Sequence, residues 1–571
     1  MSVTQITSDT LLDDVEHHFR VSAGPGAGKT YWLVEHIKNV LHRSDRLAKT
    51  KKIACITFTN IAVETILKRL GTSAEHVEVS TIHSFLYKHI VKPYASFISA
   101  EYGLNINEMD GHDDVILSNY GFLNEWKIRT GQQRIREDND LVKAFKVIKW
   151  KFDNAGNLIA KTDYPHKSGA YAIKSSSYFE YKKMTWEKGV VHHDDVLFFS
   201  YQIVQRFPFV LEILRAKFPY FFVDEFQDCN PIQVVILSFL GQRETIIGII
   251  GDKAQSIYGF QGAEPSQFQS FSLQGMIDYQ MSDNRRSSNE IIGVLNGLRS
   301  DITQNPFRNF ASTKPLILVG DMSLALRRVK TICGKEKVYS LSRKNITSNA
   351  MKNEIGGIAL NGGLFNRLIE IDKPSSNNKY RSKLVMACIK ASEYARQEKF
   401  KDAIKELEKE FKYKNDKNRS RKESLLHIMT LLAKYDTFKD NSLYHFFTIV
   451  KSEINKDISG LRNGAAKTFY DSNTYQQFAL CVNVPEDMSQ HKTIHKSKGD
   501  EFDNVLLVLN EESDLSFVLI PDINSDTNAA EEQRINYVAV SRAKNRLFIS
   551  VPSLTAANQL LLWPRFQIEN V

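Results

Sequence analysis

Long hydrophobic runs and paired cysteines are scarce in this chain of 571 residues. It contains no uninterrupted apolar run of about 18 residues and no N-terminal signal-peptide pattern, which argues against membrane insertion and secretion and predicts a cytoplasmic protein with no membrane partner. Its five cysteines are scattered without a CxxC pair. This spacing argues against a zinc ribbon, a cysteine-ligated iron–sulfur cluster and a disulfide framework.

The length and the charge balance set broad limits on what the chain can be. A chain of 571 residues exceeds what one hydrophobic core covers, so we expect roughly three to four domains of a soluble protein. The net charge of +9 leans towards polyanionic partners, but it is compatible with many cytosolic enzymes. The basic run 399–422 is interleaved with glutamates, which favours a solvated helix face over a nucleic-acid contact.

Short β-branched or aromatic runs recur between helical patterns in two sets. Continuous apolar runs of this length are typical of buried parallel strands, so the sequence predicts two α/β layers, each with a parallel sheet. The first set comprises 19–21, 53–58, 221–223 and 245–250, and the second comprises 315–319, 338–341, 505–509 and 546–550. The last predicted strand lies about twenty residues before the end of the sequence.

Two long segments between these strands are rich in Lys, Glu, Leu, Tyr and Phe and contain few strand-like runs. They are interpreted as helical insertions, one in each layer. The resulting domain prediction is a first core at 1–90 and 217–280 with an insertion at 91–216, and a second core at 281–348 and 489–571 with an insertion at 349–488.

Two motifs carry nucleotide chemistry. An apolar strand runs into Asp224 and Glu225, of which the first would hold Mg²⁺ and the second would orient or deprotonate the attacking water. By itself such a pair is more often a turn at the edge of a sheet. The phosphate-cradling loop supplies the missing half, because Lys29 would neutralise phosphates and Thr30 would offer its hydroxyl to the metal. The loop comprises Ala23, Gly24, Pro25, Gly26, Ala27, Gly28, Lys29 and Thr30, with Tyr31 adjoining it.

Six further segments appear in a fixed order. Taken together with the two motifs, they make the chain resemble the UvrD/Rep branch of superfamily 1 helicases over both predicted cores. Segments 56–62, 80–85 and 251–260 are similar to motifs Ia, Ib and III of that family, and 284–287, 493–502 and 533–543 are similar to motifs IV, V and VI.

The resemblance implies two RecA-like cores with ATP and Mg²⁺ in the cleft between them. It implies that Gln255 senses the γ-phosphate, that Arg286 and Arg542 act as arginine fingers, and that Glu501 contacts the nucleotide sugar. Fingers supplied by a second core would couple hydrolysis to domain motion.

For DNA, the resemblance implies that aromatic side chains stack on the bases of a single strand. Stacking tolerates any base, so it grips a strand without reading its sequence. Burial in the core is an open alternative for Phe58, whereas Tyr258 and Phe260 are better candidates. The full set of expected DNA-contacting residues is Phe58, Thr59, Asn60, His83, Tyr258, Phe260 and His495.

The chain departs from the family pattern at several positions. Phe260 stands where the family usually has Trp, and Gln261 follows where it usually has Arg, which predicts weaker DNA binding. Arg285 replaces a Tyr that packs on adenine, although a guanidinium can also stack on a base. No glutamine lies at the usual spacing before Lys29, since Gln5 is too far away, and strict ATP selectivity is therefore in doubt.

The run 192–195, His-His-Asp-Asp, suggests a transition-metal site because imidazoles and carboxylates are ligands of such metals. Adjacent residues rarely converge on one ion, so the favoured interpretation is an acidic stretch in which Asp195 begins a helix. The similar run 112–114 is interpreted as a polar turn or a helix start.

Two functions remain open. The first is a DNA helicase or translocase that moves 3′ to 5′ by family resemblance, on single-stranded or tailed duplex DNA. The second is a DNA-stimulated ATPase that serves as a sensor or effector subunit without productive unwinding. Compact members of this kind resemble the helicase subunit of the Gabija anti-phage system, which implies a separate nuclease subunit as partner.

Overall fold

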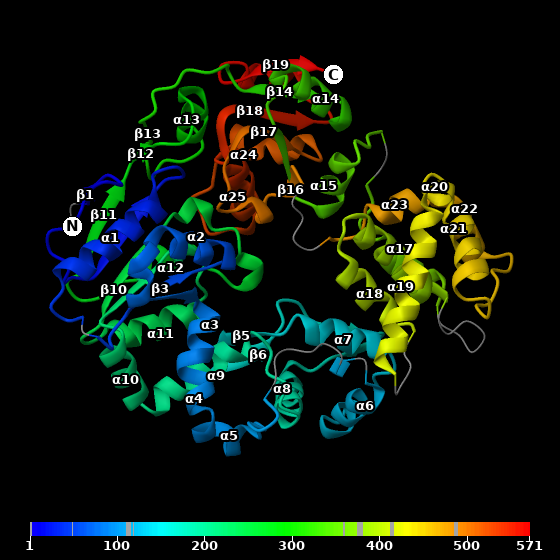
Figure 1. The fold of residues 1–571 in the computed structure, drawn as a ribbon, viewed down its shortest axis with the longest axis horizontal. Coiled ribbons are helices and arrows are strands. Elements are labelled where there is room, and N and C mark those ends of the chain that lie inside the picture. The colour runs from blue at the N-terminus through cyan, green and yellow to red at the C-terminus, as the bar shows by residue number, and fades with distance from the viewer. Residues whose placement is uncertain are drawn as a thin grey trace. The chain divides into compact units, whose positions relative to one another are not determined.

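The computed structural model describes residues 3–47, 49–109, 116–117, 119–357, 360–373, 381–411, 416–484 and 489–571. The expected polar turn at 112–114 lies outside these residues. The chain forms two compact units (Figure 1). Unit 1 comprises Met1–Ala311 and Pro521–Tyr537, and unit 2 comprises Ser312–Ile520 and Val538–Val571.

Unit 1 is built on a sheet in which, within the described residues, seven strands all pair in parallel. Parallel strands are covered on both faces, which is why the predicted runs are continuously apolar. In spatial order the strands are β1 (Thr4–Gln5), β11 (Ile277–Met281), β2 (Phe19–Ala23), β10 (Ile246–Gly251), β9 (Tyr220–Val223), β3 (Ile53–Thr57) and β4 (Val77–Thr81).

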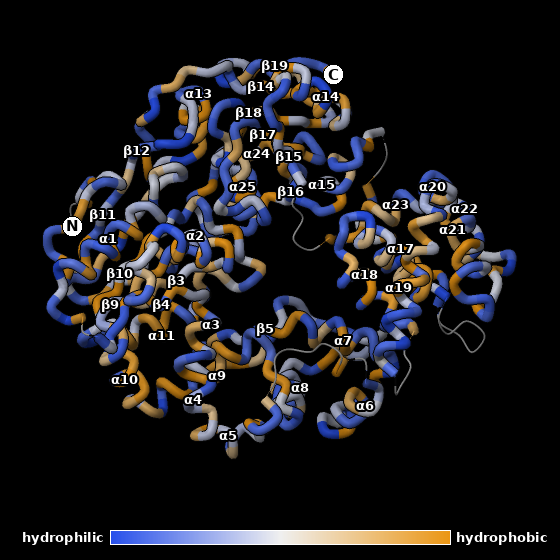
Figure 2. The backbone as a smooth tube through the Cα atoms, in the orientation of Figure 1, coloured by the Kyte–Doolittle hydropathy of each residue, from blue (hydrophilic) through white to orange (hydrophobic). Residues whose placement is uncertain are grey.

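Alternating side chains of β9 belong to two different hydrophobic cores. Tyr220 and Phe222 pack on one face with Trp32 and Ile37 of α1 (Lys29–Arg43). Phe221 and Val223 pack on the other face, with side chains of three helices. These helices are α3 (Ile82–Leu86), α9 (Asp195–Arg206) and α11 (Pro231–Gly241), and the backbone tube is largely orange through β9, β10 and α11 (Figure 2). Because successive strand residues point to opposite faces, one short strand anchors both layers.

The segment expected as the first insertion is mainly helical. Two antiparallel hairpins that the sequence did not predict interrupt it, β5–β6 (Lys149–Phe152 and Leu158–Lys161) and β7–β8 (Lys167–Ser168 and Tyr171–Ala172). Besides α9, its helices are α4 (Lys92–Tyr94), α5 (Ser96–Tyr102), α6 (Tyr120–Arg129), α7 (Asp138–Lys146), α8 (Tyr178–Glu187) and α10 (Phe209–Lys217).

Among the described residues, no single helix is both long enough and apolar enough to cross a membrane. The bent pair α9 and α10 passes that test by length and composition alone, with a bend of 105° between the two helices. Most of the apolar side chains of this pair belong to the core of unit 1.

Unit 2 contains a second parallel sheet, six-stranded within the described residues. Its strands in spatial order are β16 (His491–Thr493), β15 (Val338–Ser342), β17 (Phe502–Val508), β18 (Ala543–Val551), β14 (Leu316–Val319) and β19 (Gln567–Asn570). The prediction that the last strand is 546–550 was wrong, because β19 follows it and pairs with β14. The predicted fold class, two α/β cores with parallel sheets, is confirmed.

Helices accompany this sheet and build a separate bundle. Those near the sheet are α14 (Met322–Cys333), α15 (Asn345–Lys352), α24 (Ser516–Leu519), α26 (Ala556–Leu562) and the end of α25 (Asn528–Val540). The bundle has its own hydrophobic core. It comprises α16 (Leu364–Ile371), α17 (Arg381–Arg396), α18 (Phe400–Glu408), α19 (Lys417–Ala433), α20 (Tyr435–Phe438), α21 (Leu443–Ile449), α22 (Ala465–Ser472) and α23 (Tyr475–Ala479).

The segment 281–311 belongs to unit 1, whereas the sequence interpretation assigned it to the second core. It contains α13 (Asn289–Asn296) and a short parallel pair, β12 (Asp283–Asn284) with β13 (Asn305–Pro306). The segment Pro521–Tyr537, which includes most of α25, also belongs to unit 1. The expected domain boundaries stay predictions.

Candidate nucleotide and nucleic-acid sites

The glycine-rich loop connects β2 to the first turn of α1. Gly26 and Gly28 adopt the left-handed backbone conformation, with φ of 74° and 84°, which glycine adopts without strain. A Cβ at Gly28 would lie 2.9 Å from the Cβ of Ser8, so the position also lacks room for a side chain. The loop therefore places backbone N–H groups at a helix N-terminus, the usual arrangement for binding phosphate. Tyr31 in the first turn is exposed.

Lys29, Thr30 and Asp224 lie together at the carboxyl ends of β2 and β9. The Nζ of Lys29 donates to the carbonyl oxygens of Ala23 and Gly24 at 3.2 and 3.4 Å. The Thr30 hydroxyl lies 3.4 Å from the Asp224 carboxylate. Burial and the neighbouring Glu225 raise the pKa of Asp224 to about 7 even though Lys29 opposes the shift. A cation bound beside the Asp224 carboxylate would stabilise its ionised form.

Glu225 occupies a strained backbone position, with φ of 54° and ψ of 40°. Such conformations in non-glycine residues persist where the surroundings enforce them. The amide nitrogen of Gln227 donates to the Glu225 carboxylate, and the amide oxygen of Gln227 accepts from the backbone N–H of Asp252 at 3.0 Å. Gln227 thus ties the end of β9 to the end of β10.

Gln255 follows β10, the strand that lies between β2 and β9 in the sheet. Its side-chain amide donates to Asp252 at 2.7 Å, and both residues are buried. Lys29, Glu225 and Gln255 therefore follow three adjacent strands. In a parallel sheet the carboxyl ends of adjacent strands meet at one edge, which is where ligands bind.

The arginines expected from motif IV adjoin the phosphate loop. The backbone N–H of Arg285 donates to the carbonyl of Gly26 at 2.9 Å, and a Cβ at Gly26 would lie 2.8 Å from the Cβ of Arg286. The Arg285 guanidinium lies 3.9 Å from the ring centroid of Phe307 and pairs with Asp9. Because Arg286 belongs to the same unit as the loop, its proximity does not depend on where unit 2 lies.

Three predicted site residues belong to unit 2. Arg542 is buried and donates to the carbonyl oxygens of Val538 and Asp500 at 3.1 and 3.3 Å. The Glu501 carboxylate pairs with Lys544 at 3.0 Å. His495 begins a short 3-10 helix and is partly buried. The expected roles of these residues towards nucleotide and DNA stay predictions.

The aromatic candidates for DNA binding differ in exposure. Phe58 and Tyr258 stack with ring centroids 4.6 Å apart, and Tyr258 is only 8% exposed. Phe260 is 55% exposed. Thr59 caps α2 (Asn60–Leu70) by accepting from a backbone N–H, and Asn60 at its start is exposed. Among these candidate rings, Phe260 is the most exposed.

His83 lies against the segment that suggested a metal site. Its ring stacks on His193 with centroids 3.7 Å apart and an interplanar angle of 27°. Burial, with a smaller effect of His193, lowers the pKa of His83 to about 3, so the ring is neutral. Ligand atoms of His83, His193 and Asp194 lie within 4.8 Å of one another. An imidazole binds a metal in the plane of its ring, so two stacked rings are poorly oriented to share one ion.

The four residues 192–195 are not brought together as one ligand set. Asp195 is fully buried, accepts from the indoles of Trp150 and Trp186 at 2.9 Å each, and pairs with Lys182 at 2.9 Å. His192 contacts the Asp195 carboxylate at 3.3 Å, whereas the side chain of His193 is exposed and lies 4.0 Å from Asp194. Asp195 begins α9, which confirms the helix start expected from the sequence.

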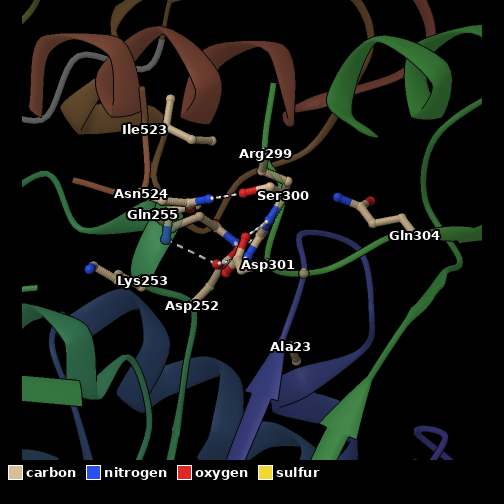
Figure 3. Close-up of polar contacts among 12 residues, drawn as sticks. Ala23, Asp252, Lys253, Gln255, Arg299, Ser300, Asp301, Gln304, Ile523 and Asn524 are labelled. Carbon is tan, nitrogen blue, oxygen red and sulfur yellow. Dashed lines mark hydrogen bonds and ion pairs between the residues drawn. The ribbon is translucent and has the colours of Figure 1, made fainter. Parts of the chain in front are cut away.

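Several residues of the site had no motif signal of their own. Arg299, Asp301 and Gln304 lie between recognisable motifs, and their contacts with Asp252 and with the phosphate loop come from the tertiary structure (Figure 3). Asp252 and Tyr537 lie within the segments 251–260 and 533–543, and Gln227 lies two residues after Glu225, but nothing in the sequence indicated their partners. A buried arginine flanked by aspartates is at most a weak signal in a sequence.

The parallel sheet, the glycine-rich loop and the carboxylates at adjacent strand ends define a P-loop nucleotide-binding protein. Comparison with family models agrees. The UvrD/REP helicase N-terminal domain matches residues 6–274, and the UvrD-like helicase C-terminal domain matches residues 275–553. The chain belongs to the UvrD/REP-like helicase family, as the order of its motifs predicted.

Curated relatives match at moderate identity. Gabija protein GajB of Bacillus cereus strain HuB5-5 is 26% identical over 326 residues, covering 49% of this chain and 46% of that protein. ATP-dependent DNA helicase PcrA is 27% identical in Staphylococcus aureus strain Mu50, covering 48% of this chain and 37% of PcrA, and 27% identical in Bacillus subtilis strain 168, covering 48% and 36%. The matched part spans less than half the length of each relative.

Proposed function

We propose that this chain is an ATP-dependent DNA helicase or translocase of the UvrD type. The observation that carries the proposal is the convergence of Lys29, Glu225 and Gln255 after three adjacent strands of one sheet. Phosphoryl transfer requires positioning and charge neutralisation more than covalent chemistry, and these groups supply both. Lys29 would neutralise the β- and γ-phosphates of ATP, and Arg286 would add a second cation beside the loop.

Mg²⁺ fits the oxygen ligands of this site. The Thr30 hydroxyl and the Asp224 carboxylate are 3.4 Å apart, and hard oxygen ligands of this kind are those that Mg²⁺ prefers. We assign these two residues as its protein ligands. The ion would neutralise charge that develops on the phosphate oxygens. The raised pKa of Asp224 supports the assignment, because burial leaves that carboxylate short of positive charge.

Glu225 and Gln255 are assigned to the attacking water. Glu225 would accept a hydrogen bond or a proton from it, and its left-handed backbone holds the carboxylate in one place. Gln255 would sense the γ-phosphate, because its side chain is fixed by Asp252 beside the metal ligands.

Movement on DNA is assigned to the surface that carries Phe260. A ring exposed by 55% can stack on a base and release it without reading the sequence. The 3′ to 5′ direction rests on family resemblance. Single-stranded or tailed duplex DNA is the proposed substrate, and a cytoplasmic location stays a prediction.

A second candidate is a DNA-stimulated ATPase that acts as a sensor or effector without productive unwinding. It is favoured by the departures in motif III, where Tyr258 is buried against Phe58 and Gln261 replaces the usual Arg. The similarity to Gabija protein GajB supports a role in anti-phage defence with a separate nuclease subunit. We retain this alternative because it predicts a different outcome in the same assay.

The test is ATP turnover by the purified chain with and without single-stranded DNA, followed by strand separation on a 3′-tailed duplex. Stimulated turnover with strand release supports the helicase, and stimulated turnover without release supports the sensor. Lys29→Ala should abolish turnover. Lys38→Ala should not, because Lys38 lies later in the same helix with a partly exposed side chain that pairs with Glu35. Turnover that survives Lys29→Ala would contradict both candidates.

A further inference from the structure

Arg299 and Asp252 form a fully buried ion pair in unit 1 (Figure 3). The Nη2 of Arg299 lies 2.9 Å from one carboxylate oxygen of Asp252, and Nη1 donates to the other at 3.1 Å. The two side chains therefore meet fork to fork, the geometry in which an arginine fixes a carboxylate most firmly. Arg299 follows α13, and Asp252 follows β10.

Arg299 uses its remaining donors on two other residues. Its Nε and Nη2 donate to the two carboxylate oxygens of Asp301 at 2.8 Å each, and its Nη1 donates to the Tyr537 hydroxyl at 3.0 Å. A guanidinium has five N–H groups, and these contacts with three residues engage all of them. The orientation of the side chain is thus completely specified.

The Asp252 carboxylate in turn fixes the orientation of the Gln255 side chain. Asp252 accepts from the amide nitrogen of Gln255 at 2.7 Å, and a carboxylate can only accept, so the amide oxygen of Gln255 must point away from it. Burial alone would raise the pKa of Asp252, but the attraction of Arg299 and Lys29 lowers it. Asp252 is therefore ionised, and the amide of Gln255 cannot turn over without losing its partner.

The same network reaches the phosphate loop through Gln304. The side-chain nitrogen of Gln304 donates to the Tyr537 hydroxyl at 3.3 Å, and its oxygen accepts from Asn284 at 2.6 Å. A Cβ at Gly24 would lie 3.3 Å from the side chain of Gln304, so the two are in contact.

The segment Pro521–Tyr537 makes further hydrogen bonds with residues that follow Gln255. Glu531 accepts from the backbone N–H of Gly259 at 2.9 Å, and Arg534 donates to the carbonyl of Ser256 at 2.9 Å. Motif III is therefore held by this segment along its length, and Tyr537 is the contact nearest to Arg299.

We infer that Arg299 is a positioning residue for ATP hydrolysis. Through Asp252 it holds the side chain of Gln255 in one orientation. Through Tyr537 and Gln304 it fixes the position of that side chain relative to the phosphate loop. This inference rests on the proposed ATPase function. Stability alone explains the arrangement poorly, because a buried ion pair gains little over apolar residues of the same volume.

The first test is Arg299→Lys, which keeps the charge and removes the fork. The expected result is a loss in kcat for ATP of about 10²-fold, the size of effect that a misplacement of roughly 1 Å produces, with ADP affinity within about twofold of the original. The matched control is Arg215→Lys. Arg215 is also buried in unit 1, but it donates to the carbonyls of Phe239 and Leu240 far from the network.

Thermal unfolding of both variants separates positioning from folding. A structural role predicts that the two variants lose activity in proportion to their loss of Tm, whereas a positioning role predicts that only Arg299→Lys loses kcat. Tyr537→Phe is a further test of the network, since it deletes the hydroxyl that accepts from Arg299 and leaves every charge in place. It should lower kcat several-fold and leave ADP affinity unchanged.

Wild-type kcat in the folded Arg299→Lys protein would overturn the inference. If that protein does not fold, wild-type kcat in Tyr537→Phe would overturn it. Failure of the proposed function looks different, because the unmodified chain would then show no ATP turnover at all.

Discussion

The ring of Tyr258 is stacked on Phe58, with centroids 4.6 Å apart, and the stack leaves Tyr258 almost without exposed surface. The sequence favoured Tyr258 and Phe260 equally as DNA-stacking residues. Only Phe260 combines a place in motif III with a largely exposed ring. The two aromatic residues therefore have different expected roles, one as support and one as contact.

Phe260→Ala should weaken binding of single-stranded DNA by about 1–3 kcal/mol, or roughly fivefold to 150-fold, without lowering Tm. Fluorescence anisotropy with a labelled oligothymidine measures the affinity. Phe400→Ala, which removes a similarly exposed ring from unit 2, is the control and should leave the affinity unchanged. Equal affinities for Phe260→Ala and the unmodified protein would contradict the assignment.

Asp224→Asn should abolish turnover and stabilise the protein in the absence of Mg²⁺ and nucleotide at pH 8. Burial and Glu225 raise the pKa of Asp224 to about 7, above the usual value near 4, so ionising it costs stability as the pH rises between these values. The expected gain in stability for Asn is therefore largest near pH 8 and vanishes near pH 4. Parallel pH profiles of unfolding for the two proteins would disagree with this account.

Arg542→Ala should nearly abolish turnover, by roughly 10³- to 10⁵-fold in kcat, while ATP still binds. Arg542 is buried and donates to protein oxygens, so its removal also costs stability. Arg542→Lys keeps the charge and is the control for that loss. Equilibrium binding of a labelled ATP analogue measures nucleotide affinity, and single-turnover hydrolysis measures the catalytic step. Near-normal turnover in Arg542→Ala would show that Arg542 does not act as an arginine finger.

Asp195→Ala should destabilise unit 1 by about 3–5 kcal/mol, because it leaves the buried ammonium of Lys182 without its partner. Burial alone would raise the pKa of Asp195, but Lys182 and His192 lower it below its usual value. Its stabilisation is therefore present above about pH 4 and is lost as the pH falls further. Thermal unfolding from pH 7 to pH 3 should show a constant difference in Tm between the variant and the original down to about pH 4 and a shrinking difference below it, with the more exposed Asp194→Ala as control.

Gly251→Ala should reduce turnover strongly. A Cβ at this position would lie 2.4 Å from the side-chain oxygen of Gln227, which would have to move and release both Glu225 and the backbone of Asp252. Gly293→Ala in α13 meets nothing within 4 Å and serves as the control. Steady-state hydrolysis compares them, and equal rates would show that Gln227 does not position Glu225.

Local patterns predicted the strands well. The runs at 221–223 and 245–250 became β9 and β10 because their side chains are apolar on both faces, which suits only a covered parallel strand. The strand β4 was missed because its burial is partial, and β19 was missed because it is short and polar at an edge of the sheet. The hairpin β5–β6 was read as helical because its composition resembled that of its helical neighbours.

The sequence by itself determined the glycine-rich loop and the carboxylates after β9, because each depends on contiguous residues whose chemistry and spacing are local. It also determined the family, through the order of the motifs. Only the tertiary structure decided that Arg299 pairs with Asp252, and that Tyr258 is buried while Phe260 is exposed. These relationships join residues from different elements or depend on what covers a side chain, and a buried ion pair forms only once folding has excluded water from both partners.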